Sequence, residues 1–545
     1  MSQNTSRRAF NAKLREAAIG LALAPWGAAF AQNINNGVNQ VDSTSLAQAS
    51  NNKRKWQVQP FTLGVASGVP RHNCVVLWTR LIISPADAQV SDSSKEPLWV
   101  GWELYADEQL KRLIKKGSEF TNEDRGHSVR VLVSDLEPST NYWYRFVSGD
   151  ATSRVGRTKT APSPSANVQS LRFALASCQH FEAGQYTAYK DIAQQDLDFV
   201  LFVGDYIYET NLNERLAVRR HIGSEPKSLE EYRSRYELYK SDPHLQAAHA
   251  AHPWVLMWDD HEVVNDYAND LDPAYSDPTV FLKRRAAAYR AYFEHQPLWL
   301  GPDSQSREQA SMRLHDRFQW GQLAELWTLD CRQFRSHHAC SKPGSGGGRL
   351  VLSCDELADP SRTMLGFEQE AWLNEGLSAS TRQWKLLAQG TQISSTRIFT
   401  PLGRATYTEA WDGYATARER LLKGVQSNQI SNVVTLGGDV HMNVAANLRL
   451  EANEESSPII ASEFVTTSIS SRGLSESATQ TIKANNSDIL HMSADERGYA
   501  LIQVDPQRVQ CEFRTTPTPA GSLESLSVQA VYYVETGQPG PKRLA

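Results

Sequence analysis

The sequence predicts an α/β protein preceded by a small β-sandwich, and two changes of pattern carry this prediction. From about Phe61 to Thr160, short segments of alternating polar and apolar residues, interleaved with aromatic residues, are separated by turn residues. This spacing is typical of a β-sandwich. After Pro162-Ser163-Pro164-Ser165, apolar runs alternate with helical stretches, which indicates an α/β domain.

The strands of the predicted sandwich are Val75 to Trp78, Leu98 to Leu104, Val129 to Val133 and Tyr142 to Phe146. The loop Leu136-Glu137-Pro138 ahead of Tyr142 resembles the one before a late strand in fibronectin type III modules. Such a module either packs against its neighbour or presents a surface to a substrate, and we favour packing.

Four apolar runs of the α/β part have the composition of buried strands, and each ends in residues that bind metal or phosphate. They are Phe173 to Ala176, Phe199 to Val203, Val255 to Trp258 and Val433 to Leu436. Helices are expected at Gln185 to Gln194, Leu229 to Tyr239, Phe281 to His295 and Ala415 to Lys423. Open α/β sheets bind ligands beyond the carboxyl ends of their strands, so we expect the residues after the four runs to converge on one edge.

Composition excludes one class of partner. The chain has 545 residues, a formal net charge of −5 and a pI near 6.3. A nucleic-acid partner bound through a broad basic face is therefore not expected. A small anionic substrate would have to be held by metal ions or by a few local cations.

The N-terminus predicts export. Arg7 and Arg8 precede a modest apolar stretch, Ala17 to Phe30, that closes on small residues, so residues 1–31 form a signal peptide and not a membrane span. The paired arginines favour the twin-arginine export machinery as a partner, with an ordinary secretory signal as the alternative. Residues 32–55 look like a flexible linker. No later stretch is long and apolar enough to span a bilayer, so we expect a periplasmic or secreted protein.

Six cysteines in an exported chain suggest disulfides. Cys331, Cys340 and Cys354 flank a glycine-rich loop that a cross-link could restrain, although the sequence does not say which pair forms. Cys74 and Cys511 lie in alternating segments and are expected to be small buried apolar residues.

Two short spacings in the strand ends suggest metal ligands. Asp205 and Tyr208 are three residues apart beyond a glycine, and a phenolate favours a trivalent ion. Asp439 and His441 alternate at a strand end and can face one point. The alternative for Tyr208 is a buried tyrosine that donates its hydroxyl to a neighbour.

The run Val255 to Trp258 is followed by two adjacent acids, Asp259 and Asp260. Two neighbouring carboxylates cannot both be buried without compensating positive charge. A divalent ion near Asp260 would remove that penalty. His261 is either a ligand or the donor of a proton to a leaving group. Cys178 would bind metal as thiolate, and a nucleophilic role for it is the less favoured reading because no dedicated base lies beside it.

Five motifs resemble, in order, those of the PhoD-type alkaline phosphatases and related phosphodiesterases. They are the segments 173–179, 204–209, 258–263, 438–441 and 463–471. The paired arginines and the N-terminal β-sandwich match that family as well, so the resemblance covers nearly the whole chain.

The resemblance implies an α/β metallophosphoesterase sandwich, with two facing mixed sheets flanked by helices, after a fibronectin-III-like domain at 56–162. The catalytic domain would span 166–545 and hold one ferric ion (Fe³⁺) and two calcium ions (Ca²⁺). The implied iron ligands are Cys178, Asp205, Tyr208 and His441, with Asp205 bridging to calcium. Asn265 and Asp439 would face calcium and Asp260 would be a further ligand, while the choice between Asn265 and Asp266 stays open.

The resulting prediction is an exported, metal-dependent alkaline phosphatase that hydrolyses small phosphate esters through attack by a metal-bound hydroxide. His261 would assist the departing alkoxide. A phosphodiesterase or phospholipase D-like hydrolase is the alternative within hydrolases. An exported binding protein with an inert α/β part is the alternative outside them, and the complete set of ligand types argues against it.

Overall fold

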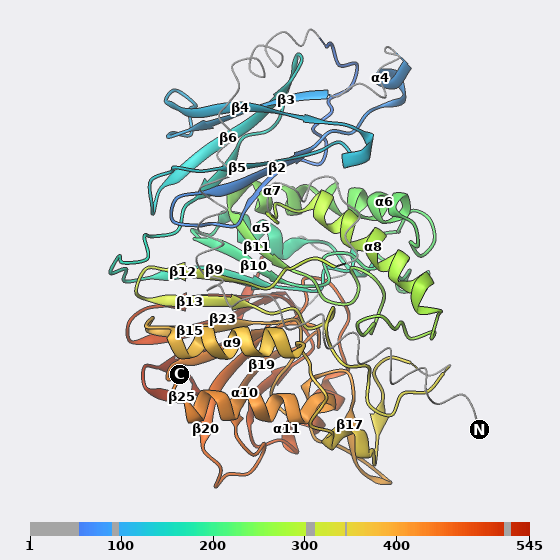
Figure 1. Ribbon diagram of the computed structural model, residues 1–545, viewed down its shortest axis with the longest axis vertical. Helices are drawn as coiled ribbons and strands as arrows, with labels where there is room; N and C mark the ends of the chain where they lie inside the picture. The colour runs from blue at the N-terminus through green and yellow to red at the C-terminus, as the bar shows by residue number, and fades with distance from the viewer. Residues whose placement is uncertain (1–53, 90–97, 301–310, 344–345, 517–524, 545) are drawn as a thin grey trace, which may run out of the picture.

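The computed structural model describes residues 54–89, 98–300, 311–343, 346–516 and 525–544 (Figure 1). The predicted signal peptide and nearly all of the predicted linker lie outside these residues. Among the described residues, no helix is both long enough and apolar enough to cross a membrane.

Two mixed sheets form the centre of the molecule. Within the described residues the larger sheet has ten strands, in the order β25 (Gln538–Arg543), β24 (Ser527–Glu535), β23 (Arg508–Thr516), β22 (Arg497–Val504), β9 (Leu171–Ala176), β10 (Phe199–Val203), β11 (Pro253–Met257), β1 (Val65–Gly68), β2 (Val75–Arg80) and β5 (Ser128–Val133). The smaller has seven, in the order β12 (Asp316–Trp320), β13 (Ala324–Thr328), β15 (Trp384–Ala388), β18 (Val433–Gly437), β20 (Ile459–Val465), β19 (Asn443–Arg449) and β21 (Ile489–Ser493).

The two sheets face each other across one apolar core. Alternate residues of a strand point to opposite faces, so Phe173 and Leu175 of β9 pack with Leu386 of β15 and Leu436 of β18 between the sheets. Their neighbours on β9, such as Ala174, pack in a separate core on the outer face. Both faces of the central strands are therefore buried, which explains why the sequence shows continuous apolar runs there.

Helices cover both outer faces (Figure 1). The outer face of the ten-stranded sheet packs against α5 (Thr187–Gln194), α6 (Leu229–Lys240), α7 (Pro243–Ala251) and α8 (Pro278–His295). The other sheet packs against α9 (Phe367–Ala379) and α10 (Ala415–Ser427), and α11 (Glu476–Ala484) lies against β21. The expected mixed α/β architecture is therefore present.

The four motif-bearing strands belong to two sheets, which corrects the expectation of a single edge. β9, β10 and β11 are parallel neighbours in the ten-stranded sheet, whereas β18 lies in the seven-stranded sheet. Because the sheets face each other, the residues that follow these strands still meet, but they do so across the gap between the sheets.

The N-terminal strands form two layers. A second sheet, made of β4 (Leu113–Thr121), β3 (Leu98–Tyr105), β6 (Asn141–Ser148), β7 (Ala151–Thr152) and β8 (Gly156–Lys159), packs on β1, β2 and β5 around a shared core. The short α4 (Pro85–Gln89) follows β2. The first layer is continuous with the ten-stranded sheet, because β1 pairs in parallel with β11. The sequence favoured packing of the N-terminal part against the α/β part. In the structure the two parts share one sheet.

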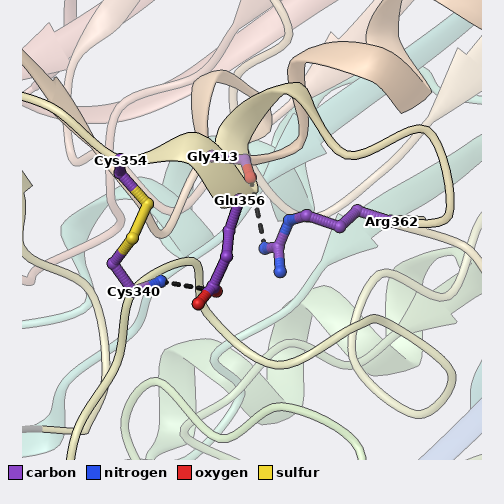
Figure 2. Close-up of a disulfide and its surroundings, with 5 residues drawn as sticks. All are labelled: Cys340, Cys354, Glu356, Arg362 and Gly413. Atoms are coloured by element: carbon purple, nitrogen blue, oxygen red, sulfur yellow. Dashed lines mark hydrogen bonds between the residues drawn. A yellow bond between two sulfur atoms is a disulfide. The ribbon is translucent and has the colours of Figure 1, made fainter.

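A disulfide joins Cys340 to Cys354, and the Cys340 N–H donates to Glu356 (Figure 2). Cys331, the third candidate, is free and buried with its Sγ 3.9 Å from Oε1 of Gln389. Beside this loop lies a three-stranded sheet in the order β14 (Leu350–Val351), β17 (Gly403–Tyr407) and β16 (Ile398–Thr400). Cys74 and Cys511 are buried and free, as predicted.

Candidate metal centre

Four predicted ligands follow the strand ends in a strained backbone conformation. Cys178, Asp205, Asp439 and His441 have φ of 60°, 61°, 63° and 55°. A residue with a side chain loses about 1 kcal/mol or more in this left-handed region, so the surrounding structure must hold these turns in place. The turns direct the side chains that follow β9, β10 and β18 toward a common point.

Close backbone packing brings the strand ends together. A Cβ added to Gly204 would meet the Asp259 Cβ at 2.5 Å, so the ends of β10 and β11 touch. A Cβ added to Gly438 would meet the Ser177 Oγ at 2.7 Å, so the two sheets touch at the same place. Only glycine fits at these two contacts.

The predicted ligands form an overlapping chain of clusters. Potential ligand atoms within 4.8 Å of one another occur in four adjoining groups: Cys178, Asp205 and His441; Asp205, Asp260 and His261; Asp259, Asp260 and Asp439; and Asp260, Asp266 and Glu409. Asp205 and Asp260 belong to more than one group. This arrangement suits several neighbouring cations better than a single ion.

Tyr208 and His441 complete the first cluster. The Tyr208 hydroxyl donates to Oδ2 of Asp205 at 2.7 Å and lies 3.1 Å from Nε2 of His441. The Nδ1 of His441 lies 2.6 Å from the carbonyl of Arg472, which fixes the tautomer with the proton on Nδ1. The lone pair of Nε2 is then available to a metal ion, and this arrangement is usual for metal-binding histidines.

His261 is paired with a buried carboxylate. Its Nδ1 lies 2.7 Å from Oε2 of Glu209, and its ring centroid lies 4.0 Å from that of Tyr208, with the two ring planes tilted by 30°. Burial acts to lower the pKa of His261, but Glu209, Asp260 and Asp205 outweigh it and raise that pKa well above its ordinary value. Glu209 engages Nδ1 of His261 and does not engage the other ring nitrogen, Nε2.

Glu262 fixes the turns after two strands. Its side chain is fully buried, and its carboxylate accepts the backbone N–H groups of Asp205 at 3.1 Å, Tyr206 at 2.6 Å and Asp259 at 2.8 Å. One side chain thus satisfies three donors that belong to the ends of β10 and β11. We infer that Glu262 holds Asp205 in its left-handed conformation.

Arginines balance part of the buried negative charge. Arg332 binds Asp259 through two contacts, of 2.5 and 3.0 Å, and its Nη2 is 3.6 Å from Asp260. Arg332 also pairs with Glu409, which Arg335 contacts at 2.9 Å. The compensation that adjacent acids at 259 and 260 require is therefore supplied in part by Arg332.

Within the described residues, Asp205 and Asp439 form no ion pair with an arginine. Burial raises the pKa of Asp205 well above its ordinary value, and neighbouring acids add to this shift although His261 opposes it. Burial and the proximity of Asp259 and Asp260 likewise raise the pKa of Asp439 well above its ordinary value. Burial also raises the pKa of the Cys178 thiol. Groups of this kind ionise readily only beside added positive charge, so the donor set fits bound cations.

The structure separates the two candidates at 265 and 266. Asn265 is exposed, and its backbone N–H donates to Oε1 of Glu209 at 2.8 Å. Asp266 points its carboxylate toward Asp260 and Glu409 and accepts the Gly348 N–H at 2.8 Å. The carboxylate of Asp266 is therefore the better placed of the two, and the choice of ligand stays a prediction.

Sequence reasoning missed several residues that build the site. Glu209 and Glu262 lie inside recognised motifs, so the sequence indicated that they are near the site. The sequence did not indicate that they are buried hydrogen-bond acceptors. Arg332, Arg335 and Glu409 lie outside any motif, and only the fold brings them to the acids. Nothing in their local sequence distinguishes them from surface charges.

The site gathers groups that could hold metal ions, and comparisons with known proteins give the family of the chain. Residues 173–513 match the PhoD-like phosphatase family model, and residues 45–162 match that of the PhoD-like phosphatase N-terminal domain. The chain belongs to the PhoD-like phosphatase family.

Two relatives match almost the whole chain. Alkaline phosphatase D of Bacillus subtilis (strain 168) is 40% identical over 498 residues, which cover 89% of this chain and 82% of that protein. A solved structure described as that of PhoD superposes with a TM-score of 0.84 at 39% identity, covering 90% of this chain and 93% of the other. The resemblance noted from the five motifs is thereby confirmed at the level of the family.

Proposed function

We propose that this protein is an exported, metal-dependent alkaline phosphatase that hydrolyses small phosphate esters and releases inorganic phosphate. The observation that carries the proposal is the convergence of Cys178, Asp205 and His441 within 4.8 Å, from strands of both sheets. Family membership and the name of the B. subtilis relative, alkaline phosphatase D, support a phosphoric ester hydrolase.

The donor types favour one ferric and two calcium ions. A thiolate, a phenolate and an imidazole, from Cys178, Tyr208 and His441, form a set that suits iron and that calcium does not use. Asp260, Asp439 and one of Asn265 and Asp266 offer only oxygen, which suits calcium. Asp205 belongs to two clusters and is placed to bridge the two kinds of ion.

Bound cations would hold the phosphate oxygens and offset the charge that accumulates in the phosphoryl transition state. The protein supplies the rest of the chemistry. Glu209 orients His261 through Nδ1 and keeps it protonated, so that Nε2 can give a proton to the departing alkoxide oxygen. Glu262 holds the Asp205 backbone so that its carboxylate keeps one orientation.

Two features support the finer fold assignment. In the N-terminal part the Glu137 N–H donates to the Tyr142 hydroxyl at 2.9 Å, which is the tyrosine corner found in immunoglobulin-like and fibronectin-III-like sandwiches. In the α/β part, two facing mixed sheets with helices outside and acids at the strand ends are the arrangement expected of a metallophosphoesterase. Export by the twin-arginine route, to the periplasm or the medium, remains a proposal drawn from Arg7 and Arg8.

The test compares two asparagine variants at opposite ends of β10. Asp205→Asn removes a proposed bridging ligand, whereas Asp198→Asn removes a buried carboxylate that pairs with Lys159. We expect Asp205→Asn to lose bound metal and at least about 100-fold in turnover of an aryl phosphate, because the cations supply most of the charge stabilisation. Asp198→Asn should keep both metal content and turnover.

Spectroscopy tests the iron assignment separately. An Fe³⁺–phenolate pair absorbs visible light, so the purified enzyme should be coloured and Tyr208→Phe should lose that band. A colourless, iron-free preparation with full activity would refute the iron site. Full activity of Asp205→Asn would refute the metal centre as a whole.

A further inference from the structure

Arg497 lies beside the proposed metal centre and belongs to none of the clusters described above. It is the first residue of β22, which runs antiparallel to β9, so its backbone lies at the end of β9 that Cys178 follows. A Cβ added to Gly473 would lie 3.3 Å from Nη2 of Arg497 and 3.4 Å from the Cβ of His441. The guanidinium group and His441 therefore lie against the same point of the backbone, and the glycine places no side chain between them.

One part of this guanidinium group is fixed and another is unpaired. Nη1 donates to the carbonyl oxygens of Ala494 at 2.8 Å and Glu496 at 2.7 Å, so both of its hydrogens are used. Among the described residues, the buried Nε has no hydrogen-bond partner, and Nη2 donates to no group of the chain. Nε and Nη2 carry parallel N–H groups on one edge of the planar guanidinium, which is the fork that binds two oxygens of a phosphate or a carboxylate.

No group of the described chain accounts for the unpaired edge. Arg497 forms no ion pair there, and no aromatic ring covers its guanidinium. Arg130 is equally buried, at 6% exposure, and also leaves Nε unpartnered, but its guanidinium lies over the Phe293 ring at 3.7 Å. A buried donor without a partner is destabilising, so the free edge of Arg497 points to an anion from outside the chain.

Arg497 keeps its positive charge at neutral pH and in mildly alkaline solution. Burial and the neighbouring Arg472 lower its pKa to about 10, although the charges of Asp495, Cys178 and Tyr208 act in the other direction. Cys178 and Tyr208 are proposed iron ligands, so the guanidinium lies within electrostatic reach of the groups around which a phosphate ester would bind. The charge and the free edge thus occur at the same place.

We propose that Arg497 is a substrate-binding residue whose Nε and Nη2 donate to two terminal oxygens of the phosphate group held at the proposed metal centre. Inorganic phosphate, the product, takes the same contact. This inference rests on the proposed phosphatase function and names a contact that the substrate of that function makes. Arg497 makes and breaks no bond, and it offsets part of the charge on the phosphoryl oxygens.

The experiment uses the full chain in its metal-loaded form. Wild type, Arg497→Lys and Arg497→Gln are titrated with inorganic phosphate in a calorimeter, and kcat and KM are measured with a water-soluble aryl phosphate. Arg497→Lys keeps the positive charge but lacks the fork, so it separates the two contributions. The control is Arg130→Lys, the same change at an equally buried arginine of β5. Elemental analysis and thermal unfolding of each protein report metal content and folding.

We expect both Arg497 variants to bind inorganic phosphate at least about tenfold more weakly than wild type, because two charge-assisted hydrogen bonds are lost. Their kcat/KM should fall by a similar factor while metal content stays at the wild-type level. Arg130→Lys should bind phosphate and turn over the ester like wild type.

Two results overturn the proposal. One is wild-type affinity for phosphate in an Arg497→Lys protein that retains its metal. The other is loss of metal from Arg497→Lys but not from the control, which would show that Arg497 supports the ligands instead of the substrate. Wild type that binds phosphate but does not hydrolyse the aryl phosphate would refute the phosphatase function and leave the assignment of Arg497 standing.

Discussion

The stabilisation that the proposed cations give this protein should grow as the pH rises from about 4 to 7. In the metal-free protein, burial raises the pKa of Glu262 from its ordinary 4.5 to about 7, and that of Asp266 from 3.8 to about 7. A buried acid with a raised pKa favours folding most below its unfolded pKa, and this contribution is lost as the pH rises through the folded pKa. The window set by these two groups is therefore about pH 4 to 7.

The magnitude follows from one carboxyl group. A shift of about 2.5 pH units for Glu262 corresponds to roughly 3 kcal/mol of unfolding free energy lost between pH 4.5 and 7. In a chain of this length, 1 kcal/mol changes the melting temperature by about 1 °C, so one group contributes about 3 °C. Cations that neutralise the cluster should abolish this loss, because ionised carboxylates are then the favoured form.

Thermal unfolding of metal-loaded and chelator-stripped protein at four pH values measures this effect. Buried neutral histidines outside the centre, such as His295, also make stability depend on pH, but they do so equally in both forms. The difference between the two melting temperatures isolates the metal centre. A difference that stays constant or shrinks toward pH 7 would show that these carboxyls are not the ones the cations neutralise.

Three further outcomes test single side chains. Glu262→Gln should lower the free energy of unfolding, measured in urea, by about 1–3 kcal/mol, because the NH₂ group of glutamine would face the Tyr206 N–H, and both are donors. A loss below about 0.5 kcal/mol would contradict the role given to Glu262. Cys340→Ser should lower unfolding stability by up to about 3 kcal/mol, and reductant should do the same to wild type but not to the variant. Asp266→Asn should release more calcium on dialysis than Asn265→Ala, as elemental analysis would show, whereas the opposite order would assign the ligand to Asn265.

Periodicity predicted the central strands well because they are buried on both faces. The run Phe199 to Val203 coincides with β10, and the run that begins at Val433 extends only one residue further, to Gly437. The predicted helix from Phe281 begins earlier, at Pro278, because Asp277 caps it through the Thr279 N–H at 2.8 Å. Boundaries of this kind depend on caps, which apolar spacing does not register.

Several helices were not anticipated, and two of them, α7 and α9, show different reasons. Asp242 caps the start of α7 by accepting the N–H groups of His244 and Leu245. The alanine-rich sequence of α7, however, has no clear apolar stripe. α9 follows Gly366 without a side-chain cap and buries only a narrow face. In both cases tertiary packing supplies the stability that the local pattern does not indicate.

Ligand types could be recognised from the sequence, but their charge balance could not. Cys178, Asp205 and His441 each follow a strand, so their convergence is a consequence of topology that a strand prediction can anticipate. Arg332 reaches Asp259 from 73 positions away and Glu409 from 77, and no local rule relates these residues. Similarly, the pairing of Cys340 with Cys354 depends on how the loop folds.

The proposed metal centre contains several residues in an unfavourable backbone conformation, and surrounding contacts offset part of that cost. Four of the proposed ligand residues adopt left-handed backbone conformations that would each cost about 1 kcal/mol or more in isolation. Glu262 offsets part of that cost by binding three backbone donors, and contact between Gly438 and Ser177 removes the space into which the turns could relax. The backbone of the two sheets thus orients the proposed ligands before any cation binds. It follows that chelation should remove activity while leaving the fold intact, so that metal added back restores activity without refolding.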